Sequence, residues 1–470
     1  MNDETILSQI KGLTADSRMV RRGWLFAALQ GKTADGRMFI NDAIVNGASV
    51  ILVPEGTEVP EASGVTFVSD PDARRRFALL AAGFYRLQPK TVVAVTGTNG
   101  KTSTVTFASQ LWDALGKTSA SLGTLGIVSR ITMKKGGLTT PDPAQLQAEL
   151  ADLAAAGITH LAMEASSIGI DQRRLDGVKL AAAAFTNLTH DHLDYHGTMD
   201  SYYEAKARLF DTLLPSGAPA ILCVNDEYGE KLAARVKQPK VRIGAGKDFE
   251  IRVDQQTPTP FGQILDVTVG GKPYRINLPL VGLFQGMNAL TAAGIVMSTE
   301  KVGFDSLVAH LENLQGVPGR LQLVPGAPVY VDYAHTPHGL ETVLKALRPH
   351  TKGRLVVVFG CGGDRDKGKR PVMGGIATTL ADLAIITDDN PRSENPGTIR
   401  AEIRAGAPNA AEIGDRRTAI REAVAGLEAN DVLIIAGKGH EQGQIVGSEV
   451  LPFDDVAEAA NAIGELKRAV

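Results

Sequence analysis

The stretch TVVAVTGTNGKT, from Thr91 to Thr102, decides the fold of this 470-residue chain. An apolar run rich in Val leads into a Gly-rich segment that ends in Lys-Thr, and helical spacing continues from about Lys101 to Leu115. A strand, a Gly-rich loop and a helix start in this order aim backbone N–H groups and the amino end of the helix at one point. We therefore predict a phosphate-binding loop between a strand and a helix.

This loop predicts binding of ATP with Mg²⁺. Lys101 adds a positive charge for the β- and γ-phosphates, and the Thr102 hydroxyl is a candidate ligand of Mg²⁺. The usual Walker spacing has glycine where Val95 stands, so we interpret the loop as a shortened variant. An ordinary Gly-rich turn is the alternative. The candidate ATP-binding residues of the loop are Gly97, Thr98, Asn99, Gly100, Lys101, Thr102 and Ser103.

Short apolar runs recur on both sides of the loop, with helical patterns between them. They are ITHLAME, LAAAAFTN, PAILCVND, RLVVVFG, ADLAIITD and DVLIIAG. This alternation predicts an α/β fold with mostly parallel sheets, and the chain length suggests about three domains. We expect a small N-terminal α/β domain (1–89), a central ATP-binding parallel-sheet domain (90–320) and a C-terminal Rossmann-like domain (321–470). Residues 250–280 alternate around a Gly-Gly turn and predict an attached antiparallel hairpin.

Composition narrows the class of protein. The chain has 49 basic and 52 acidic residues, a balance that argues against nucleic acid as a partner. Two cysteines are too few for a disulfide scaffold, and the first residues lack the pattern of a signal peptide, so we expect a cytoplasmic location. The uncharged segment 276–299 contains Pro279 and several amides; we interpret it as a strand end, a loop and a core helix, and not as a membrane span.

Polar side chains follow the central strands, where parallel sheets gather their functional groups. Glu164 follows one strand and offers a hard oxygen to Mg²⁺, and the run HDHLDYH (190–196) follows the next and offers a histidine to a second metal. A zinc site in that run is the alternative, but it lacks paired cysteines or HExxH spacing. Lys206 lies in a helical segment, where a lone lysine normally faces solvent.

Together these residues resemble the Mur ligase family, the ATP-dependent amide-forming enzymes of peptidoglycan synthesis. The resemblance covers nearly the whole chain. It rests on TGTNGKT, EASS, NLTHDHLDYHG followed by YxxAKxxLF, GVPGR, VDYAHTP and DNPR, with an N-terminal DSRxVxxGxLFxAxxG that resembles the family's UDP-binding domain. It implies a carbamate on Lys206, formed from CO₂, which with Glu164 holds two Mg²⁺ ions. Thr102 would lie on the first ion and His192 on the second. The implied catalytic residues are Lys101, Glu164, His192 and Lys206.

The resemblance also assigns residues to the nucleotides. Asn288 would contact adenine, and Arg320 and Asp332 would contact phosphate and ribose; a linker salt bridge is the alternative for Arg320. Gln285 stands where the family has an asparagine. The implied contacts to a UDP-MurNAc dipeptide are Ser17, Thr139, Thr140, Ser166, Gln172 and Arg174. Leu138 and Lys32–Ala34 depart from the family pattern, although Lys32 can still meet a phosphate, and helix capping is the alternative for Ser17.

The segment DNPR (389–392) points to the amino-acid acceptor. Pro391 stiffens the loop, and the planar fork of Arg392 can grip a carboxylate at two points. Diaminopimelate differs from lysine by one distal carboxylate and its charge, and in the family DNPR marks the diaminopimelate-adding type. The candidate acceptor contacts are Arg365, Asp389, Asn390, Pro391, Arg392, Gly437 and Glu441. Surface ion pairs are the alternative, and FGCGGDRDKGKRP lacks the third glycine of a dinucleotide fingerprint.

The resemblance therefore implies a ligase that uses ATP to join meso-diaminopimelate to the D-Glu γ-carboxylate of UDP-MurNAc-L-Ala-D-Glu. We expect a monomer whose partners are these small molecules, with neither nucleic acid nor membrane. Two alternatives remain: another amide ligase, such as a folylpolyglutamate synthetase, and a nucleotide-regulated binding protein without catalysis. DNPR and the UDP-type first domain count against the former. The set of Glu164, His192 and Lys206 counts against the latter, because mere binding does not need it.

Overall fold

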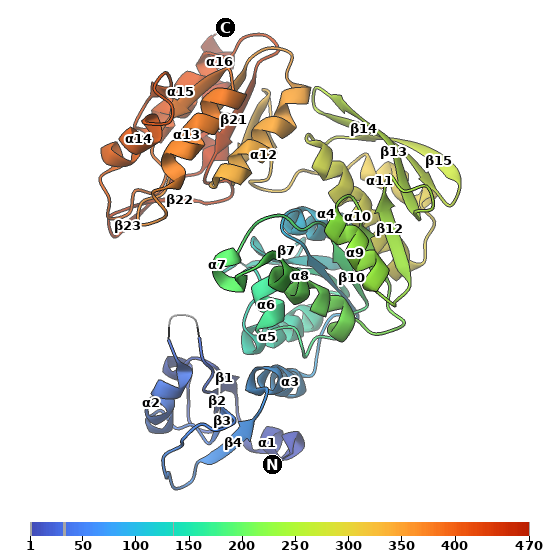
Figure 1. Cartoon of the computed structure of the whole chain (residues 1–470), viewed down its shortest axis with the longest axis vertical. Helices are drawn as coiled ribbons and strands as arrows, with labels where there is room; N and C mark the ends of the chain where they lie inside the picture. The colour runs from blue at the N-terminus through green and yellow to red at the C-terminus, as the bar shows by residue number, and fades with distance from the viewer. Residues whose placement is uncertain (1, 32–33, 135, 470) are drawn as a thin grey trace. The chain divides into compact units, whose positions relative to one another are not determined.

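The computed structural model describes residues 2–31, 34–134 and 136–469, so the predicted phosphate contact of Lys32 lies outside the described residues. The chain forms two compact units (Figure 1). The first comprises Met1–Arg252 with Leu290–Leu307, and the second comprises Val253–Ala289 with Val308–Val470. The three-domain division at 89/90 and 320/321 stays a prediction.

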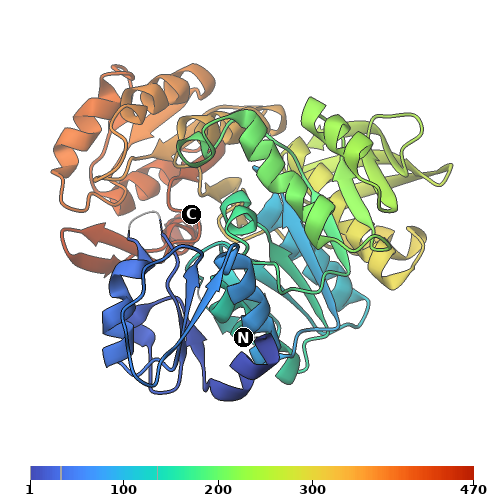
Figure 2. The same ribbon diagram turned by 60° about the horizontal axis from the view of Figure 1, so that its bottom comes forward.

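The first unit opens with a four-stranded parallel sheet. Its strands, in spatial order, are β1 (Leu13–Thr14), β2 (Leu25–Ala27), β3 (Val50–Pro54) and β4 (Thr66–Asp70). Successive side chains of a strand point to opposite faces. Val50 and Leu52 therefore pack with α1 (Asp3–Gln9) and α3 (Ala73–Tyr85), and Ile51 packs with α2 (Ile40–Val45) on the other face. Figure 2 shows this small sheet, in blue, with its helices. The short turns η1 (Ser17–Met19) and η2 (Gly36–Phe39) complete this layer.

A larger sheet follows in the first unit, with the strand order β12-β11-β10-β5-β9-β6-β7-β8. The strands are β5 (Thr91–Thr96), β6 (Ser119–Gly123), β7 (Gly126–Ser129), β8 (Met133–Lys134), β9 (His160–Glu164), β10 (Ala182–Phe185), β11 (Ala220–Cys223) and β12 (Lys240–Gly244). Pairing is parallel from β12 to β6 and antiparallel at β7 and β8. Residues Val92 to Val95 are fully buried, which explains a continuous apolar run without alternation. The carboxyl end of β5 therefore lies between those of β9 and β10.

Helices connect these strands, as the sequence predicted. They are α4 (Lys101–Ala114), α5 (Pro143–Ala155), α6 (Ser167–Asp171), α7 (Leu193–His196), α8 (Met199–Arg208), continued by the π-turn η3 (Leu209–Leu213), and α9 (Glu227–Arg235). The helix predicted from Lys101 is confirmed to within one residue at its end, and Lys206 lies on a helix as expected.

The second unit contains the predicted antiparallel hairpin. Strands β14 (Gly262–Val269) and β15 (Lys272–Leu278) pair around Gly270 and Gly271, both with positive φ, next to β13 (Ile251–Thr259). The uncharged segment 276–299 is a strand end, a loop and the helix α10 (Leu283–Glu300), as predicted. Across the described part of the chain, no helix has both the length and the apolar character needed to cross a bilayer.

The rest of the second unit is a doubly wound domain with a six-stranded sheet of order β16-β17-β21-β18-β19-β20. Its strands are β16 (Gln322–Val324), β17 (Val329–Asp332), β18 (Leu355–Phe359), β19 (Leu383–Ile386), β20 (Ala411–Glu412) and β21 (Val432–Ala436). All pairs except β16–β17 are parallel, which confirms the Rossmann-like prediction. The separate strands β22 (Gly443–Val446) and β23 (Glu449–Pro452) form a hairpin.

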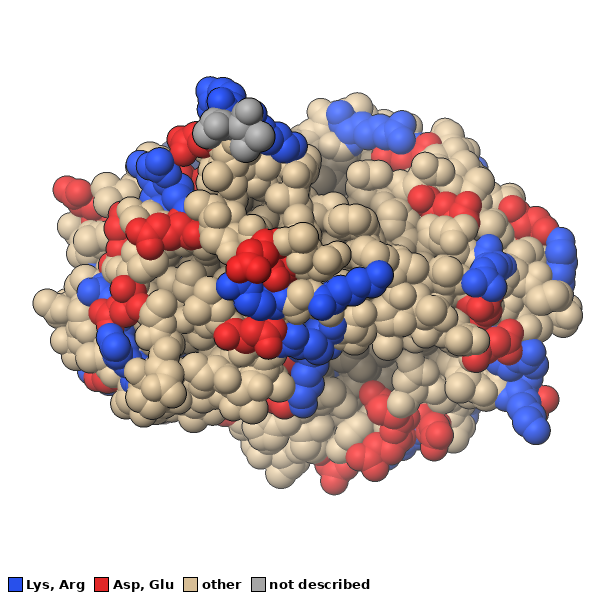
Figure 3. All heavy atoms as spheres, turned by 90° about the horizontal axis from the view of Figure 1, so that it is seen from above, with Lys and Arg blue, Asp and Glu red and all other residues tan. Residues whose placement is uncertain are grey.

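Helices cover both faces of this sheet. One apolar core joins it to α12 (Pro337–Leu347), α13 (Lys369–Leu380) and α14 (Pro396–Arg404), and a second core joins it to α15 (Arg416–Ala425) and α16 (Asp455–Ala469). The remaining helical segments are α11 (Asp305–Leu311) and the turn η4 (Arg348–His350). Basic and acidic side chains are interspersed over the face shown in Figure 3, as the net charge of −3 leads one to expect.

Candidate active site

The phosphate loop lies between β5 and α4, at the centre of the larger sheet. Gly97 has a φ of +148°, and a Cβ there would lie 1.9 Å from Thr186 Oγ1, so this position accepts only glycine. The segment that follows β10 supports the loop, because Thr98 N donates to Asn187 O and Asn99 N donates to Asn187 Oδ1. Lys101 Nζ donates to the carbonyls of Gly97 and Thr98, both at 2.9 Å. The lysine therefore stands over the loop that we expect to receive phosphate.

Glu164, at the end of β9, joins the phosphate loop to its neighbours. Its Oε1 accepts hydrogen bonds from Thr102 Oγ1 at 2.9 Å and from Thr124 N at 2.8 Å. The side chain is buried, with an exposed fraction of 1%. The structure thus brings together the two residues predicted to hold the first Mg²⁺. A hydroxyl next to a carboxylate is a set of hard oxygen ligands that fits Mg²⁺.

Lys206 is buried at the same loop, with 1% of its surface exposed. The solvent-facing alternative is therefore wrong. Its Nζ donates to Gly97 O at 2.8 Å and lies 4.5 Å from the centre of the Tyr202 ring. Burial, reinforced by the charge of Lys101, holds the pKa of Lys206 well below its ordinary value. The uncharged amine that carbamate formation requires is thereby favoured.

The histidine run lies partly open to solvent beside this cluster. His192 has a φ of +51°, its ring is half exposed, and its Nε2 lies 3.6 Å from Asp191 Oδ2. His196 instead hydrogen-bonds Ser167 Oγ through Nε2, and burial lowers its pKa. Among the described residues, no group of three or more His, Cys, Asp or Glu is poised to hold a metal ion. The run therefore offers no preformed zinc site in this part of the chain.

Five of the six residues predicted to bind the dipeptide form one hydrogen-bonded network beside Glu164. Thr140 Oγ1 donates to Glu164 O and accepts from Ser166 N. Arg174 donates to Thr140 O at 2.6 Å and to Gln172 Oε1 at 2.7 Å, and burial lowers its pKa. Thr139 Oγ1 lies 3.1 Å from Thr124 Oγ1, which also reaches Glu164. These five residues are thus connected with one another and, through Glu164, with Thr102 of the phosphate loop.

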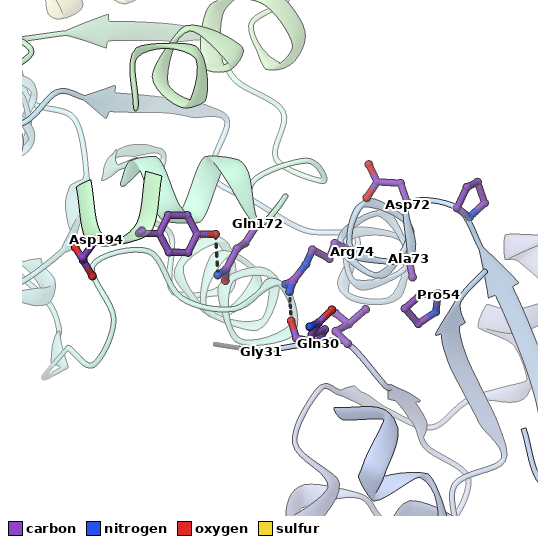
Figure 4. A pocket seen from close by; sticks show the side chains of 11 residues that line it. Gln30, Gly31, Pro54, Asp72, Ala73, Arg74, Gln172 and Asp194 are labelled. Carbon is purple, nitrogen blue, oxygen red and sulfur yellow. Dashed lines mark hydrogen bonds between the residues drawn. The ribbon is translucent and has the colours of Figure 1, made fainter. Parts of the chain in front are cut away.

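A pocket of about 490 Å³ lies in the first unit, where Gln172 ends the hydrogen-bonded network (Figure 4). It is lined by Leu29, Gln30, Gly31, Pro54, Pro71, Asp72, Ala73, Arg74, Gln172, Asp194 and Tyr195. Of the predicted residues only Gln172 lines it, with its amide 3.3 Å from Tyr195 OH. Arg74 hydrogen-bonds Gln30 O in the wall. No sequence pattern singled out Arg74 as a lining residue. Its two neighbours Arg75 and Arg76 face the carboxylates of Asp176 and Asp3.

Ser17 lies apart from these contacts. It is buried, and its carbonyl accepts a hydrogen bond from Asn46 Nδ2 at 3.0 Å. The capping alternative does not apply to it, because Asp16 caps the turn η1 through a bond to Arg18 N. Its predicted contact with the nucleotide sugar stays a prediction.

In the second unit, three residues were assigned to the nucleotide. Asn288 is buried, and its side-chain amide donates to Gln285 Oε1 at 2.9 Å. Gln285, which replaces the family's asparagine, thus still provides a partner for Asn288. The carboxylate of Asp332 accepts from Leu321 N and Ala334 N, both at 2.8 Å, and burial raises its pKa. The Arg320 guanidinium stacks 5.0 Å from the Tyr333 ring centre. Arg320 therefore makes a cation–π contact, and its charge also acts on the Asp332 carboxyl, where it opposes the effect of burial on the pKa.

The predicted acceptor residues other than Arg365 lie beyond the carboxyl ends of β19 and β21 in the second unit. Asn390 Nδ2 donates to Glu441 Oε2 at 2.9 Å, which joins the two segments. Gly437 has a φ of +121°, and a Cβ there would lie 2.5 Å from Asp389 Oδ2, so glycine is required for this carboxylate to approach. Asp389 and Asn390 are buried at 7% and 4% exposure. These positions therefore form one polar cluster, and not the surface ion pairs of the alternative interpretation.

The DNPR loop also presents its arginine. Arg392 has a φ of +52°, its N donates to Ile445 O, and its Nη1 donates to Gly363 O at 2.8 Å. This leaves the rest of the fork available to a carboxylate. Arg365 is exposed on the neighbouring loop, and Pro391 is buried.

Beneath this cluster lies an ion pair with no exposed surface. Arg416 donates to both carboxylate oxygens of Asp455 at 2.7 Å. It also donates to Ala436 O, the last carbonyl of β21, at 3.0 Å. The ion pair therefore supports the strand end that carries Gly437.

The fold and these clusters define an α/β protein with an ATP-type phosphate loop and a separate doubly wound domain. Three family models match the chain: the Mur ligase family catalytic domain (residues 9–85), the Mur ligase middle domain (95–296) and the Mur ligase glutamate ligase domain (319–439). The chain belongs to the Mur ligase family, whose members are ATP-dependent ligases that form amide bonds.

Individual relatives match over nearly their whole length. The chain is 54% identical to the UDP-N-acetylmuramoyl-L-alanyl-D-glutamate–2,6-diaminopimelate ligase of Caulobacter vibrioides, over 97% of this chain and 95% of that protein. It is 52% identical to the ligase of the same name from Brucella melitensis, over 97% and 94%. A solved structure with the same name matches with a TM-score of 0.73 and 34% identity, over 97% of this chain and 95% of that one.

Proposed function

We propose that this protein uses ATP to join meso-diaminopimelate to the γ-carboxylate of D-Glu in UDP-MurNAc-L-Ala-D-Glu, in peptidoglycan precursor synthesis. The observation that carries the proposal is the acceptor cluster, in which Asp389, Asn390 and Glu441 meet beside Arg392 at two strand ends. The names of the relatives that match nearly the whole chain support the same substrates. An acceptor with a second carboxylate and a second ammonium fits these charges.

The first step is phosphorylation of the substrate γ-carboxylate by ATP. Lys101, held over the phosphate loop, offsets the negative charge that develops on the transferred phosphate. We propose that Gly97 to Ser103 bind the phosphates and that Asn288, Arg320 and Asp332 bind adenine, phosphate and ribose. The hydroxyls of Thr139, Thr140 and Ser166, with Gln172 and Arg174, orient the dipeptide, and Ser17 contacts the nucleotide sugar.

Mg²⁺ is the metal that this donor set suits. We propose that Glu164 and a carbamate on Lys206 hold the two ions, with Thr102 on the first ion and His192 on the second. Carbamylation converts the buried Lys206 ammonium into an anion, and its burial near Lys101 supports that change of charge. When bound, the ions neutralise charge on the phosphates and the acyl group.

In the second step, the amine of diaminopimelate attacks the acyl phosphate, and the tetrahedral intermediate expels phosphate. Asp389, Asn390 and Glu441 receive ammonium groups of the acceptor, while Arg392 and Arg365 receive its distal carboxylate. Pro391 stiffens this loop and Gly437 leaves room for Asp389. The products are the UDP-MurNAc tripeptide, ADP and phosphate.

We further propose a cytoplasmic monomer with a nucleotide-sugar domain (1–89), an ATP domain (90–320) and an amino-acid domain (321–470). The two cysteines, Cys223 and Cys361, are both buried and free, which suits a reducing compartment. The near balance of charge supports partners that are small molecules and neither nucleic acid nor membrane.

The test is ADP release by the purified protein with UDP-MurNAc-L-Ala-D-Glu and a panel of amino acids. We expect turnover with meso-diaminopimelate and much weaker turnover with L-lysine. Equal turnover with lysine would refute the role given to DNPR. Turnover with a folate substrate and glutamate alone would replace the proposed function by the folylpolyglutamate alternative.

A further inference from the structure

Lys438 is a buried lysine that no part of the proposed mechanism uses. It follows Gly437 at the end of β21 in the second unit, and its side chain has no exposed surface. A buried ammonium is costly unless it is paired and hydrogen-bonded. The partners of Lys438 therefore show what it does.

Its partners are two of the proposed acceptor contacts. Lys438 Nζ donates to Asn390 Oδ1 at 3.0 Å and to Glu441 Oε2 at 3.2 Å. Asn390 Nδ2 donates to the same Oε2 at 2.9 Å. The ammonium, the amide and the carboxylate thus form a closed triangle of hydrogen bonds.

This triangle fixes the orientation of the Asn390 amide. Its Oδ1 accepts from Ile445 N at 2.9 Å as well as from Lys438. Turning the amide over would place its NH₂ group against two donors and would lose the bond to Glu441. Lys438 and Ile445 N together therefore select the orientation in which the Asn390 amide donates to Glu441.

The two oxygens of the Glu441 carboxylate differ in their partners. Oε2 is occupied by Lys438 and Asn390, and about a third of the side chain is exposed. No side chain or backbone group among the described residues donates to Oε1, so this oxygen remains able to accept from an ammonium. Lys438 thus holds one oxygen of the carboxylate and leaves the other without a partner in the described part of the chain.

We propose that Lys438 is a positioning residue for the amino-acid acceptor, holding Asn390 and Glu441 in the geometry that receives an acceptor ammonium. The inference rests on the proposed function, because it assumes that this cluster binds the acceptor. It assigns to Lys438 no contact with ATP or with the nucleotide sugar. Its removal should therefore affect one substrate and spare the other two.

The experiment is steady-state kinetics of Lys438→Met in all three substrates. Hydrogen bonds to charged groups contribute enough that we expect the KM for diaminopimelate to rise about 10- to 100-fold. The KM for ATP, the KM for the nucleotide substrate and kcat should stay near those of the unmodified protein. Lys345→Met, which removes an exposed lysine paired with Glu341, is the matched control and should change none of them.

A second variant separates positioning from general damage. In Lys438→Met/Glu441→Gln the cation and its partner charge are both removed, so its loss should be smaller than the product of the two single losses. If Lys438→Met does not fold, Lys438→Gln keeps one donor and should retain part of the affinity for the acceptor.

Three results would overturn the inference: an unchanged acceptor KM in a folded Lys438 variant, a rise shared equally by all three substrates, or single losses that multiply in the double variant. A failure of the proposed function is distinguishable from these. It would appear as absence of turnover with diaminopimelate in the unmodified protein.

Discussion

Thr102 and Glu164 lie 62 positions apart in the chain, yet Thr102 Oγ1 donates a 2.9 Å hydrogen bond to Glu164 Oε1. The bond joins the first turn of α4 to the end of β9, because β5 and β9 are parallel neighbours. Two chain segments with separate signals in the sequence thus meet at one point. The Mg²⁺ proposal depends on this meeting.

Glu164→Gln tests that proposal. The variant keeps the shape of the side chain and an amide oxygen that can accept from Thr102 and Thr124, but it removes the negative charge. We expect ADP release to fall at least about 100-fold, because charge stabilisation at the phosphates is the main catalytic contribution. Activity is measured over a range of Mg²⁺ concentrations. The control is Glu204→Gln, at an exposed pair with Arg235, and undiminished activity of Glu164→Gln would contradict the prediction.

Lys206→Ala tests the carbamate. We expect activity to be lost and to be partly restored by short carboxylic acids, which can place a carboxylate where the carbamate stood. Lys231→Ala, at an exposed lysine over the Tyr203 ring, should behave like the unmodified protein. Exchange with ¹³C-labelled bicarbonate, followed by NMR, reports the carbamate directly. Full activity of Lys206→Ala would rule the modification out as a requirement.

Arg392→Lys tests the choice of acceptor. Lysine keeps the charge but not the planar fork, so a carboxylate loses one of its two hydrogen bonds. We expect the KM for diaminopimelate to rise about 10- to 100-fold, with a smaller change for L-lysine as acceptor. Arg404→Lys, at an exposed arginine paired with Glu412, serves as control. A preference for diaminopimelate that stays the same in Arg392→Lys would remove this residue from the specificity argument.

The hydrogen bonds of the buried His350 predict that the protein loses stability as the pH becomes acidic. Its Nε2 accepts from Gly282 N at 2.9 Å and its Nδ1 donates to Thr259 O at 2.6 Å, which requires the neutral ring. Burial lowers its pKa below the ordinary 6.5, and the smaller effect of the Thr259 carbonyl opposes this. The unfolded chain therefore binds the proton first as the pH falls. The stabilisation is complete above about pH 6.5 and is lost as the pH drops from there towards the lowered pKa.

The measurement is urea denaturation at a series of pH values for the unmodified protein and for His350→Gln. The variant should be less stable near neutral pH and should show a smaller loss of stability between neutral and acidic pH. His338→Gln, on an exposed part of α12, is the control. Identical pH dependence in His350→Gln and the unmodified protein would show that another group is responsible.

The α/β fold could be predicted from the pattern of apolar residues. Strands that are buried on both faces have continuous apolar sequences, and the segments between them have helical spacing. Val92 to Val95 are all fully buried, and the neighbouring runs became β9 and β10. The site residues at strand ends followed from the same rule, since parallel strands bring their carboxyl ends together. This explains why Glu164 was found beside Thr102.

Sequence could not supply the contacts that depend on tertiary packing. Lys206 meets Gly97 across 109 positions, and its spacing on α8 alone suggested an exposed lysine. Arg74 lines the pocket while its two neighbours face carboxylates, a difference that the run of three arginines does not show. Lys438 carried no signal, because a lysine gains its role only from the groups that surround it when it is buried.

The buried pair of Arg416 and Asp455 has a consequence for the C-terminal part of the chain. Asp455 is the first residue of α16, and its partner holds the last carbonyl of β21. Removing α16 would leave the buried Arg416 guanidinium, which lies under the acceptor cluster, without its carboxylate partner. We expect the free energy of unfolding to fall by about 3–5 kcal/mol. The helix α16, to which no predicted acceptor contact belongs, thus supports the strand end that carries the proposed acceptor cluster.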